Sequence, residues 1–433
     1  MHHDDQGLSK GAERSANVIP LRPSAPTDTA GQIAANLQRL AVDASTTLTG
    51  LVATADEYGV EVPPHVRQAA AVLDGSAAGQ GTVNRRQALG QAAALAGALV
   101  LRQRIGALRG LRRVAGDDAG ERVTQVLQRP SRVDAATVAD MEAVTAAYRR
   151  SYRQLSVRTL LPQSEGQVGV VRELLGGSMK ATLRDRLTAT AGEATALVGV
   201  MLLMDLYEFD AAWAKLGDAL EAAREAKARE LEAFVLGCMA FNAGYTGRRV
   251  EAVDLVTLAR RLAAEGDGAT TRGWLAAVEG ELRARSGNAS GCLAALEAAG
   301  RALETSTPDS WIGIGAFDAA KLKGYYGLCY LQLRRPYEAV KELTGALDAL
   351  DPTLRKHRCT ALADLATALI DLGEVEEGCR RAGQALNLAI DLRHAVSVDR
   401  IRDLDQRLAP WGDAAAVRAF REQLVEQLLL NAS

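Results

Sequence analysis

Aromatic side chains are scarce in this sequence. Phe, Trp and Tyr together make up 4% of its 433 residues, beside 40 glycines and many alanine-rich stretches. Strands are enriched in aromatic and β-branched residues, so this composition argues against a β-sandwich. Small side chains let helices pack closely against each other, and the composition therefore favours an all-α protein.

Paired cysteines, clustered histidines and excess positive charge are missing too. The five cysteines are dispersed and form no C-x-x-C pair, which is typical of reduced core thiols in a cytoplasmic protein. None of the five histidines has a second ligand at metal-site spacing, so we expect no metal and no cofactor. The formal net charge is −2, which excludes a uniformly basic nucleic-acid-binding protein.

Catalytic and membrane-spanning signals are equally hard to find. The sequence has no P-loop, no G-x-S-x-G, no H-E-x-x-H and no dinucleotide-binding fingerprint, so we predict a non-enzymatic protein without catalytic residues. The apolar run from Ala88 to Leu101 is shorter than the ~20 residues that a membrane-spanning helix needs. We therefore expect a cytoplasmic protein with no membrane partner.

Composition divides the chain into four regions. Residues 1–30 are polar, carry three prolines and predict a disordered tail. Residues 31–80 predict a small helical segment that could be a degenerate helix-turn-helix, and residues 81–133 predict basic connecting helices. Between Arg85 and Arg132 the chain holds ten arginines and three acids, a local charge of +7. Residues 134–433 read as continuous helical sequence, with capping helices from Val396 to Leu430.

An internal repeat organises this last region. Small residues recur at steps of 40, 40, 47 and 39: Ala212, Ala252, Cys292, Ala339 and Gly378. Four positions later the residues are Leu216, Val256, Leu296, Leu343 and Ala382, and seven positions later they are all alanine. Positions i, i+4 and i+7 share one helix face, where small side chains allow a neighbouring helix to approach. Five residues before each small residue stands the expected turn residue: Tyr207, Gly247, Gly287, Arg334 and Gly373. The spacing predicts five to seven helical hairpins.

The best-preserved unit resembles a tetratricopeptide repeat. Residues 322–352 read LKGYYGLCYLQLRRPYEAVKELTGALDALDP and carry the signature positions of that family. The resemblance implies an all-α, right-handed superhelix of tetratricopeptide-like hairpins. The period near 40 exceeds the usual repeat length of about 34, and the extra residues would lengthen the helices.

A more specific resemblance covers residues 141–411. The segments AVTAAYRRSYRQL (143–155), LLPQSEGQVGVVRELL (160–175), GRRVEAVDLVTLARRLA (247–263), SGCLAALEAA (290–299), ADLATALIDLGEVEEGC (363–379) and RLAPW (407–411) are similar to the sensor regions of actinobacterial transcriptional regulators. Such regions commonly follow an Xre-type helix-turn-helix, whereas residues 32–73 lack a polar recognition helix. Some relatives that repress sporulation and antibiotic production are similarly built, as repeats without an obvious DNA-binding domain.

In such an array, the first helices of successive hairpins line a concave groove in which peptides bind. The groove residues predicted from the register, together with residues of the insertion between 306 and 317, are Met201, Phe241, Asn242, Tyr245, Trp274, Glu281, Trp311, Phe317, Asp318, Lys321 and Asp371. Met201 and Phe241 fit an inter-helix core equally well, and Trp311 could simply fill the gap that the insertion makes. Asn242 could hydrogen-bond a peptide backbone.

Five arginines are the best candidates for nucleic-acid contact: Arg102, Arg104, Arg109, Arg112 and Arg113. Helical spacing spreads them over more than one face, which favours a solvated linker helix over a phosphate-tracking stripe.

We therefore predict a non-enzymatic regulator that binds a peptide or protein in the groove. By resemblance, it controls transcription of developmental or secondary-metabolite genes. Two alternatives stay open. The first is direct DNA binding through residues 31–132, with the repeats used for sensing or homodimerisation, and the second is a scaffold for a protein complex.

Overall fold

The computed structural model describes residues 62, 105–128, 133–266, 268–306, 313–314 and 317–431, and the following statements concern these residues. The predicted tail 1–30 lies outside the described residues. So do the segment 31–80 apart from Val62, and the residues Arg102, Arg104 and Trp311.

The fold is all-α, and no strand occurs in the described part of the chain. Residues 105–115 are helical and precede α5 (Asp117–Gln128). Six antiparallel pairs follow: α6 (Ala135–Ser151) with α7 (Val157–Leu175), α8 (Ala181–Val200) with α9 (Phe209–Glu225), α10 (Arg229–Tyr245) with α11 (Arg249–Ala264), α12 (Ala269–Arg285) with α13 (Ala289–Leu303), α14 (Ala319–Gln332) with α15 (Pro336–Ala349), and α16 (Arg355–Asp371) with α17 (Val375–Leu392). The chain closes with α18 (Ala395–Arg407), which packs on α16 and α17, a 3₁₀ turn (Ala409–Trp411), and α19 (Ala415–Asn431), which packs on α17.

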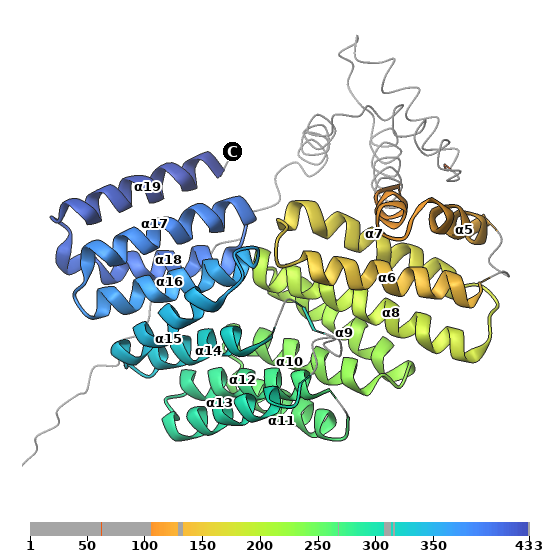
Figure 1. Ribbon diagram of the computed structural model, residues 1–433, viewed down its shortest axis with the longest axis horizontal. Coiled ribbons are helices and arrows are strands. Elements are labelled where there is room, and N and C mark those ends of the chain that lie inside the picture. Colours follow the sequence, from red (N-terminus) through yellow and green to blue (C-terminus); the bar gives the residue numbers. More distant parts are fainter. Residues whose placement is uncertain are drawn as a thin grey trace, which may run out of the picture.

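The hairpins stack in chain order into a curved array. Figure 1 shows it running from α5–α8 in orange and yellow-green, through α10–α13 in green, to α14–α19 in teal and blue. The first helix of each hairpin contacts the first helix of the next, as α10 does with α12 and α14 with α16. These first helices, from α8 to α16, therefore line the inner side of the curve.

The predicted repeat register is confirmed in the second helices. The small residue of each unit is the fourth residue of its helix and is buried, as is every residue four and seven positions later. Leu216, Leu296 and Leu343, which follow by four positions, are each fully buried against the first helix of the same hairpin. There they meet glycines: an added Cβ at Gly280 would lie 3.0 Å from Leu296, and one at Gly327 would lie 2.3 Å from Leu343. The absence of side chains at these crossings sets how closely the paired helices approach.

The predicted turn residues are confirmed as well. Gly247, Gly287 and Gly373 have φ between 74° and 84°, and the two non-glycine turn residues, Tyr207 and Arg334, have φ of 57° and 60°. A left-handed backbone costs a residue with a Cβ about 1 kcal/mol or more, whereas glycine adopts it freely.

We expect Arg334→Gly to raise the free energy of unfolding by up to about 1 kcal/mol, because Arg334 is exposed and left-handed. Gly373→Ala at the matching turn should lower it by about 1 kcal/mol. Chemical denaturation of both variants measures the two effects, and a shift in the same direction for both would contradict the role assigned to the turn.

A π-helical turn, Met201–Leu206 (η2), extends α8. It adds one residue to the first helix of this hairpin, so the glycine that faces the leucine of the second helix stands 13 residues before Ala212, at Gly199. In the α12–α13 and α14–α15 hairpins the matching distance is 12 residues. The extra residue rotates the end of α8 relative to the repeat register.

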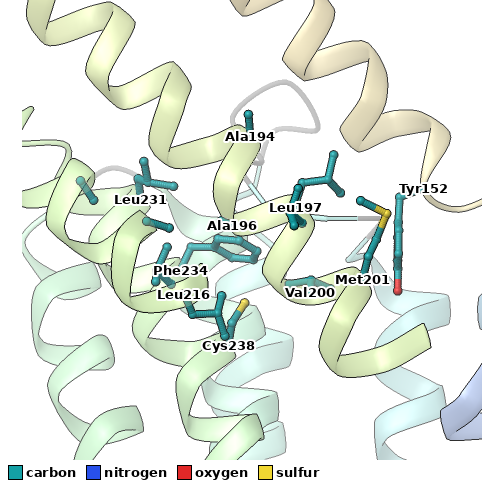
Figure 2. Packing of buried hydrophobic residues seen from close by; sticks show 14 of the residues in the cluster. Tyr152, Ala194, Ala196, Leu197, Val200, Met201, Leu216, Leu231, Phe234 and Cys238 are labelled. Carbon is teal, nitrogen blue, oxygen red and sulfur yellow. The ribbon is translucent and has the colours of Figure 1, made fainter. Parts of the chain in front are cut away.

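The stretch Ala181–Leu206 is, by length and composition, apolar enough to cross a membrane. It is the first helix of a hairpin, packs against α6, α7, α9 and α10, and is 83% buried inside the protein over its apolar window. Figure 2 shows Ala194, Ala196, Leu197 and Val200 of this helix in the same buried cluster as Leu216, Leu231 and Phe234. All five cysteines are free and buried, as predicted.

Candidate functional site

The curved array closes on itself. Lys356 at the start of α16 reaches back to the π-helical turn after α8, where its Nζ lies 2.7 Å from Oδ1 of Asp205. The Lys356 side chain is 2% exposed and that of Asp205 is 0% exposed. Lys356 also lies over the ring of Tyr152, 3.7 Å from its centroid, and the Tyr207 hydroxyl donates to Asp399 of α18 at 3.4 Å. Helix α16 is thus joined to a turn about 150 residues earlier in the chain, and α18 contacts a residue 192 positions earlier.

Closure leaves a half-open cavity at the centre of the array, with a volume of about 150 Å³. We call it the central cavity. It is lined by Tyr152, by the end of α8 and η2 (Val200, Leu203, Met204), by α10 (Phe234, Cys238, Phe241, Tyr245), by α12 (Trp274, Glu281), by the segment before α14 (Ile314, Phe317), by α14 (Ala320, Lys321, Gly324, Tyr325, Leu328), by Leu350, by α16 (Lys356, His357, Thr360, Ala361, Asp364), and by His394 and Arg400.

Aromatic rings are concentrated among the residues that line the central cavity, although they are scarce in the chain. Of the 16 aromatic residues that the structure describes, seven line the cavity. The Phe234 and Trp274 rings are 5.1 Å apart, those of Phe241 and Trp274 are 6.2 Å apart, and those of Phe317 and Tyr325 meet edge to face at 5.9 Å. Such a wall suits an apolar or aromatic group of a ligand.

Two arginine–carboxylate ion pairs lie close to the aromatic residues of the central cavity. Arg400 of α18 binds Asp364 of α16 with an Nη1–Oδ2 distance of 2.5 Å, and Arg285 binds Glu281 at 2.9 Å within α12. Burial raises the pKa of the Asp364 carboxyl, and the Arg400 guanidinium lowers it part of the way back. Tyr245 connects the two pairs, since Arg285 lies 4.8 Å from its ring and Arg400 interacts with its hydroxyl.

Two histidines face the same space. Burial, together with the neighbouring Lys356, Lys321 and arginine side chains, holds the pKa values of His357 and His394 well below the usual range. Both imidazoles are therefore neutral at pH 7. Nδ1 of His394 lies 2.8 Å from the Ser397 hydroxyl, whereas Nδ1 of His357 is buried without a hydrogen-bond partner.

Six of the predicted groove residues line the central cavity: Phe241, Tyr245, Trp274, Glu281, Phe317 and Lys321. Their positions follow the repeat. Counted back from the small residue of the second helix, cavity residues recur at 18, 14, 11 and 7 positions, as in Phe234, Cys238, Phe241 and Tyr245. Ligand contact by these residues stays a prediction.

Four other predicted groove residues are placed elsewhere. Met201 is fully buried in the core (Figure 2), because the extra residue of the π-helical turn moves Val200 and Met204 to the cavity positions. The amide nitrogen of Asn242 donates to the Phe209 carbonyl at 2.9 Å, so this side chain is used within the fold.

Asp318 and Asp371 are exposed, and both form their interactions outside the cavity. The Asp318 carboxylate accepts a hydrogen bond from the Lys321 backbone N–H and caps α14. Asp371 forms an ion pair with Arg407 of α18 at 2.6 Å. Neither residue lines the cavity.

The sequence analysis missed several cavity residues. Tyr325 and Asp364 stand 14 positions before Ala339 and Gly378, so the repeat register, applied to every unit, would have found them. Lys356, His394 and Arg400 carry no such signal, because they reach the cavity only through the closure of the array.

Of the five arginines predicted for nucleic-acid contact, the structure describes three, and such contact stays a prediction. Arg109 and Arg113 are exposed on the helical residues 105–115, whereas Arg112 packs over Gly120, where an added Cβ would meet its Cγ at 2.3 Å. No group of histidine, cysteine and acidic side chains suited to a metal ion occurs among the residues that the structure describes.

Comparison with known proteins adds little at the level of sequence. No protein-family model matches the chain, and no curated protein matches it. Among solved structures, 19 chains match, including the crystal structure of a Rap protein complexed with competence and sporulation factor. That protein is 10% identical to this chain, with a TM-score of 0.47 over 77% of this chain and 98% of its own.

Proposed function

We propose that the protein is a non-enzymatic regulator that binds a short peptide, free or as an end of a partner protein, in the central cavity. The observation that carries this proposal is the cavity itself. It is half open, lies at the centre of a closed helical array, and combines an aromatic wall with fixed charged groups. Ligand sites have this composition, with a mostly apolar surface and a few placed polar groups.

The size of the cavity limits what enters it. A protein cavity of about 150 Å³ accommodates a molecule such as benzene, and the central cavity has about this volume. One or two side chains of a peptide would fill it, while the rest of the peptide lies across the open mouth. The two cavity carboxylates, Glu281 and Asp364, are each held by an arginine, which favours binding over acid–base chemistry.

Binding would be transmitted through the closure of the array. A ligand in the cavity touches α10 and η2 from one part of the chain and α16 and α18 from another. A ligand that fits the closed form better than an opened form shifts the population towards closure and changes the outer surface. From the sequence resemblance to actinobacterial sensor regions, we propose that this surface acts on transcription.

The test uses a variant that fills the cavity. An added Cβ at Gly324 of α14 has no atom within 4 Å, so Gly324→Leu should fold normally and project into the cavity. Wild type and Gly324→Leu, each expressed in the native host at equal levels, are purified, and bound peptides are extracted and identified by mass spectrometry. We expect a defined peptide on the wild type and at least about 10-fold less of it on the variant, a loss of about 1.4 kcal/mol in binding.

Transcript sequencing of a deletion strain complemented with either protein provides the second measurement. The variant should fail to restore the wild-type profile although its circular dichroism is unchanged and its thermal midpoint is not lowered. Recovery of no peptide from the wild type, or of equal amounts from both proteins, would count against the proposed function. Gly217→Ala, in a helix away from the cavity and also with free space around its Cβ, serves as the matched control.

A further inference from the structure

Lys321 is the one cavity cation without an ion-pair partner among the described residues. Its Nζ lies 5.6 Å from the centroid of the Tyr325 ring, which is a cation–π contact. Burial and the nearby Arg400 guanidinium together lower the pKa of its ammonium group to about 8, although the Asp364, Glu281 and Asp318 carboxylates act in the opposite direction. An ammonium group in such a place costs stability unless an anion arrives to pair with it.

The other charges around the cavity cancel in pairs. Lys356 is paired with Asp205, Arg400 with Asp364, and Arg285 with Glu281. Asp318, the remaining acid close to Lys321, is exposed and caps α14. The central cavity is thus left with an excess of one positive charge, which matches a monoanion better than a phosphate dianion.

A second polar group of the cavity lining also lacks a partner. Nδ1 of His357, on α16, is buried and makes no hydrogen bond. The His357 imidazole is close enough to Lys321 for the ammonium to lower its pKa. A neutral imidazole can place its proton on Nδ1 and donate a hydrogen bond to an oxygen that is already paired with the lysine.

From this juxtaposition we infer that the central cavity binds a carboxylate attached to an apolar or aromatic group. The carboxylate would pair with Nζ of Lys321 and accept a hydrogen bond from His357, while the apolar group packs against Trp274, Phe317 and Tyr325. The inference rests on the proposed function and narrows its ligand class. Two sources supply this chemistry: the C-terminal residue of a peptide, or a free aromatic acid.

The experiment compares acids with their amides. Isothermal titration measures the binding of 3-phenylpropionate and 3-phenylpropanamide, and of N-acetyl-Gly-Leu-Phe with a free or an amidated C-terminus. We expect at least one acid to bind wild type about 10- to 100-fold more tightly than its amide, as a charge-assisted hydrogen bond allows. Preference in the peptide pair identifies a peptide C-terminus as the source, and preference in the phenylpropionate pair alone identifies a free acid.

Lys321→Met should abolish that preference and leave the affinity for the amides unchanged. Lys323→Met is the matched control, since Lys323 is exposed on the same helix, and it should retain the preference. In wild type the preference should fall between pH 7 and pH 9.5, because Lys321 loses its proton around pH 8. His357→Phe should weaken acid binding less than Lys321→Met does.

A second readout does not depend on the ligand. At pH 7, the removal of an unpaired ammonium group in Lys321→Met should raise the thermal midpoint above that of wild type and of Lys323→Met. The gain should shrink at pH 9.5, where the folded wild type carries Lys321 uncharged.

Each outcome decides between the two ideas. Equal binding of acids and amides, with both lost in Gly324→Leu, would overturn the carboxylate inference and leave the proposed function standing. Binding of none of the four probes, together with no gain in thermal midpoint, would also overturn the inference. The proposed function fails separately, if the wild type extracted from its host carries no peptide.

Discussion

Replacement of Lys356 by methionine is expected to lower the free energy of unfolding by about 3–5 kcal/mol. Lys356 and Asp205 form an ion pair whose side chains are 2% and 0% exposed. Methionine keeps most of the volume of lysine over the Tyr152 ring but leaves the Asp205 carboxylate buried without a cation. Guanidinium denaturation of wild type and variant at pH 7 measures the loss.

The double variant Asp205→Leu/Lys356→Met separates the charge from the packing. Well-packed apolar residues in place of a buried ion pair are often neutral or stabilising, so the double variant should be closer to wild type than the single variant is. Arg172→Met removes a partner of the exposed pair Arg172–Asp218 and should cost less than about 1 kcal/mol. A loss below 1 kcal/mol in Lys356→Met would mean that the closure does not depend on this pair.

The loss in free energy of unfolding caused by Lys356→Met should also depend on pH. In wild type, burial raises the pKa of the Asp205 carboxyl to about 6, although Lys356 pulls it down. Without the lysine this pKa rises further, so between about pH 6 and its own raised pKa the folded variant holds a proton that the folded wild type and the unfolded chain have both released. Stability of the variant therefore increases as the pH falls through this window, and its deficit relative to wild type should be smaller at pH 5 than at pH 8.

Gly327→Ala and Gly324→Ala should have opposite effects although the two glycines share α14. A Cβ at Gly327 would lie 2.3 Å from Cγ of Leu343, so the variant should lose about 1–3 kcal/mol through overpacking. A Cβ at Gly324 meets nothing within 4 Å, and alanine there should raise stability by up to about 1 kcal/mol through helix propensity.

Thermal denaturation of the two variants in one buffer provides the comparison. Because the same substitution is made in the same helix, propensity contributes equally to both, and the difference isolates the crossing of α14 and α15. If both variants gain stability, Leu343 can move aside and the close approach of the helices is not what glycine serves.

Much of the fold could be predicted from the repeat register. Each second helix has a small residue at its fourth position and a mostly apolar residue four positions later. This pattern depends only on helical periodicity and close packing, which are both local properties. The left-handed turns at Tyr207 and Arg334 were found in the same way, since their place in the unit rather than their residue type marked them. The cavity positions of Phe241, Tyr245 and Trp274 follow from the same period.

At one helix, a single inserted residue made the positions predicted from the repeat register wrong. The π-helical turn after α8 shifts the inner face by one position, so Met201 packs in the core while Val200 and Met204 line the cavity. Such a turn depends on how α8 packs against its neighbours, and the local sequence MLLMDL is apolar except for Asp205.

By itself the sequence determined the helices, their pairing and the inner stripe of side chains, because these depend on contacts within one or two repeats. Only the tertiary structure decided that the array closes through Lys356 and Asp205, that Arg400 and His394 reach the central cavity, and that Lys321 is left without an acid. These features depend on the summed curvature of six hairpins, to which every helix crossing adds a small angle. No local pattern records that sum, and it determines which charges meet across the cavity.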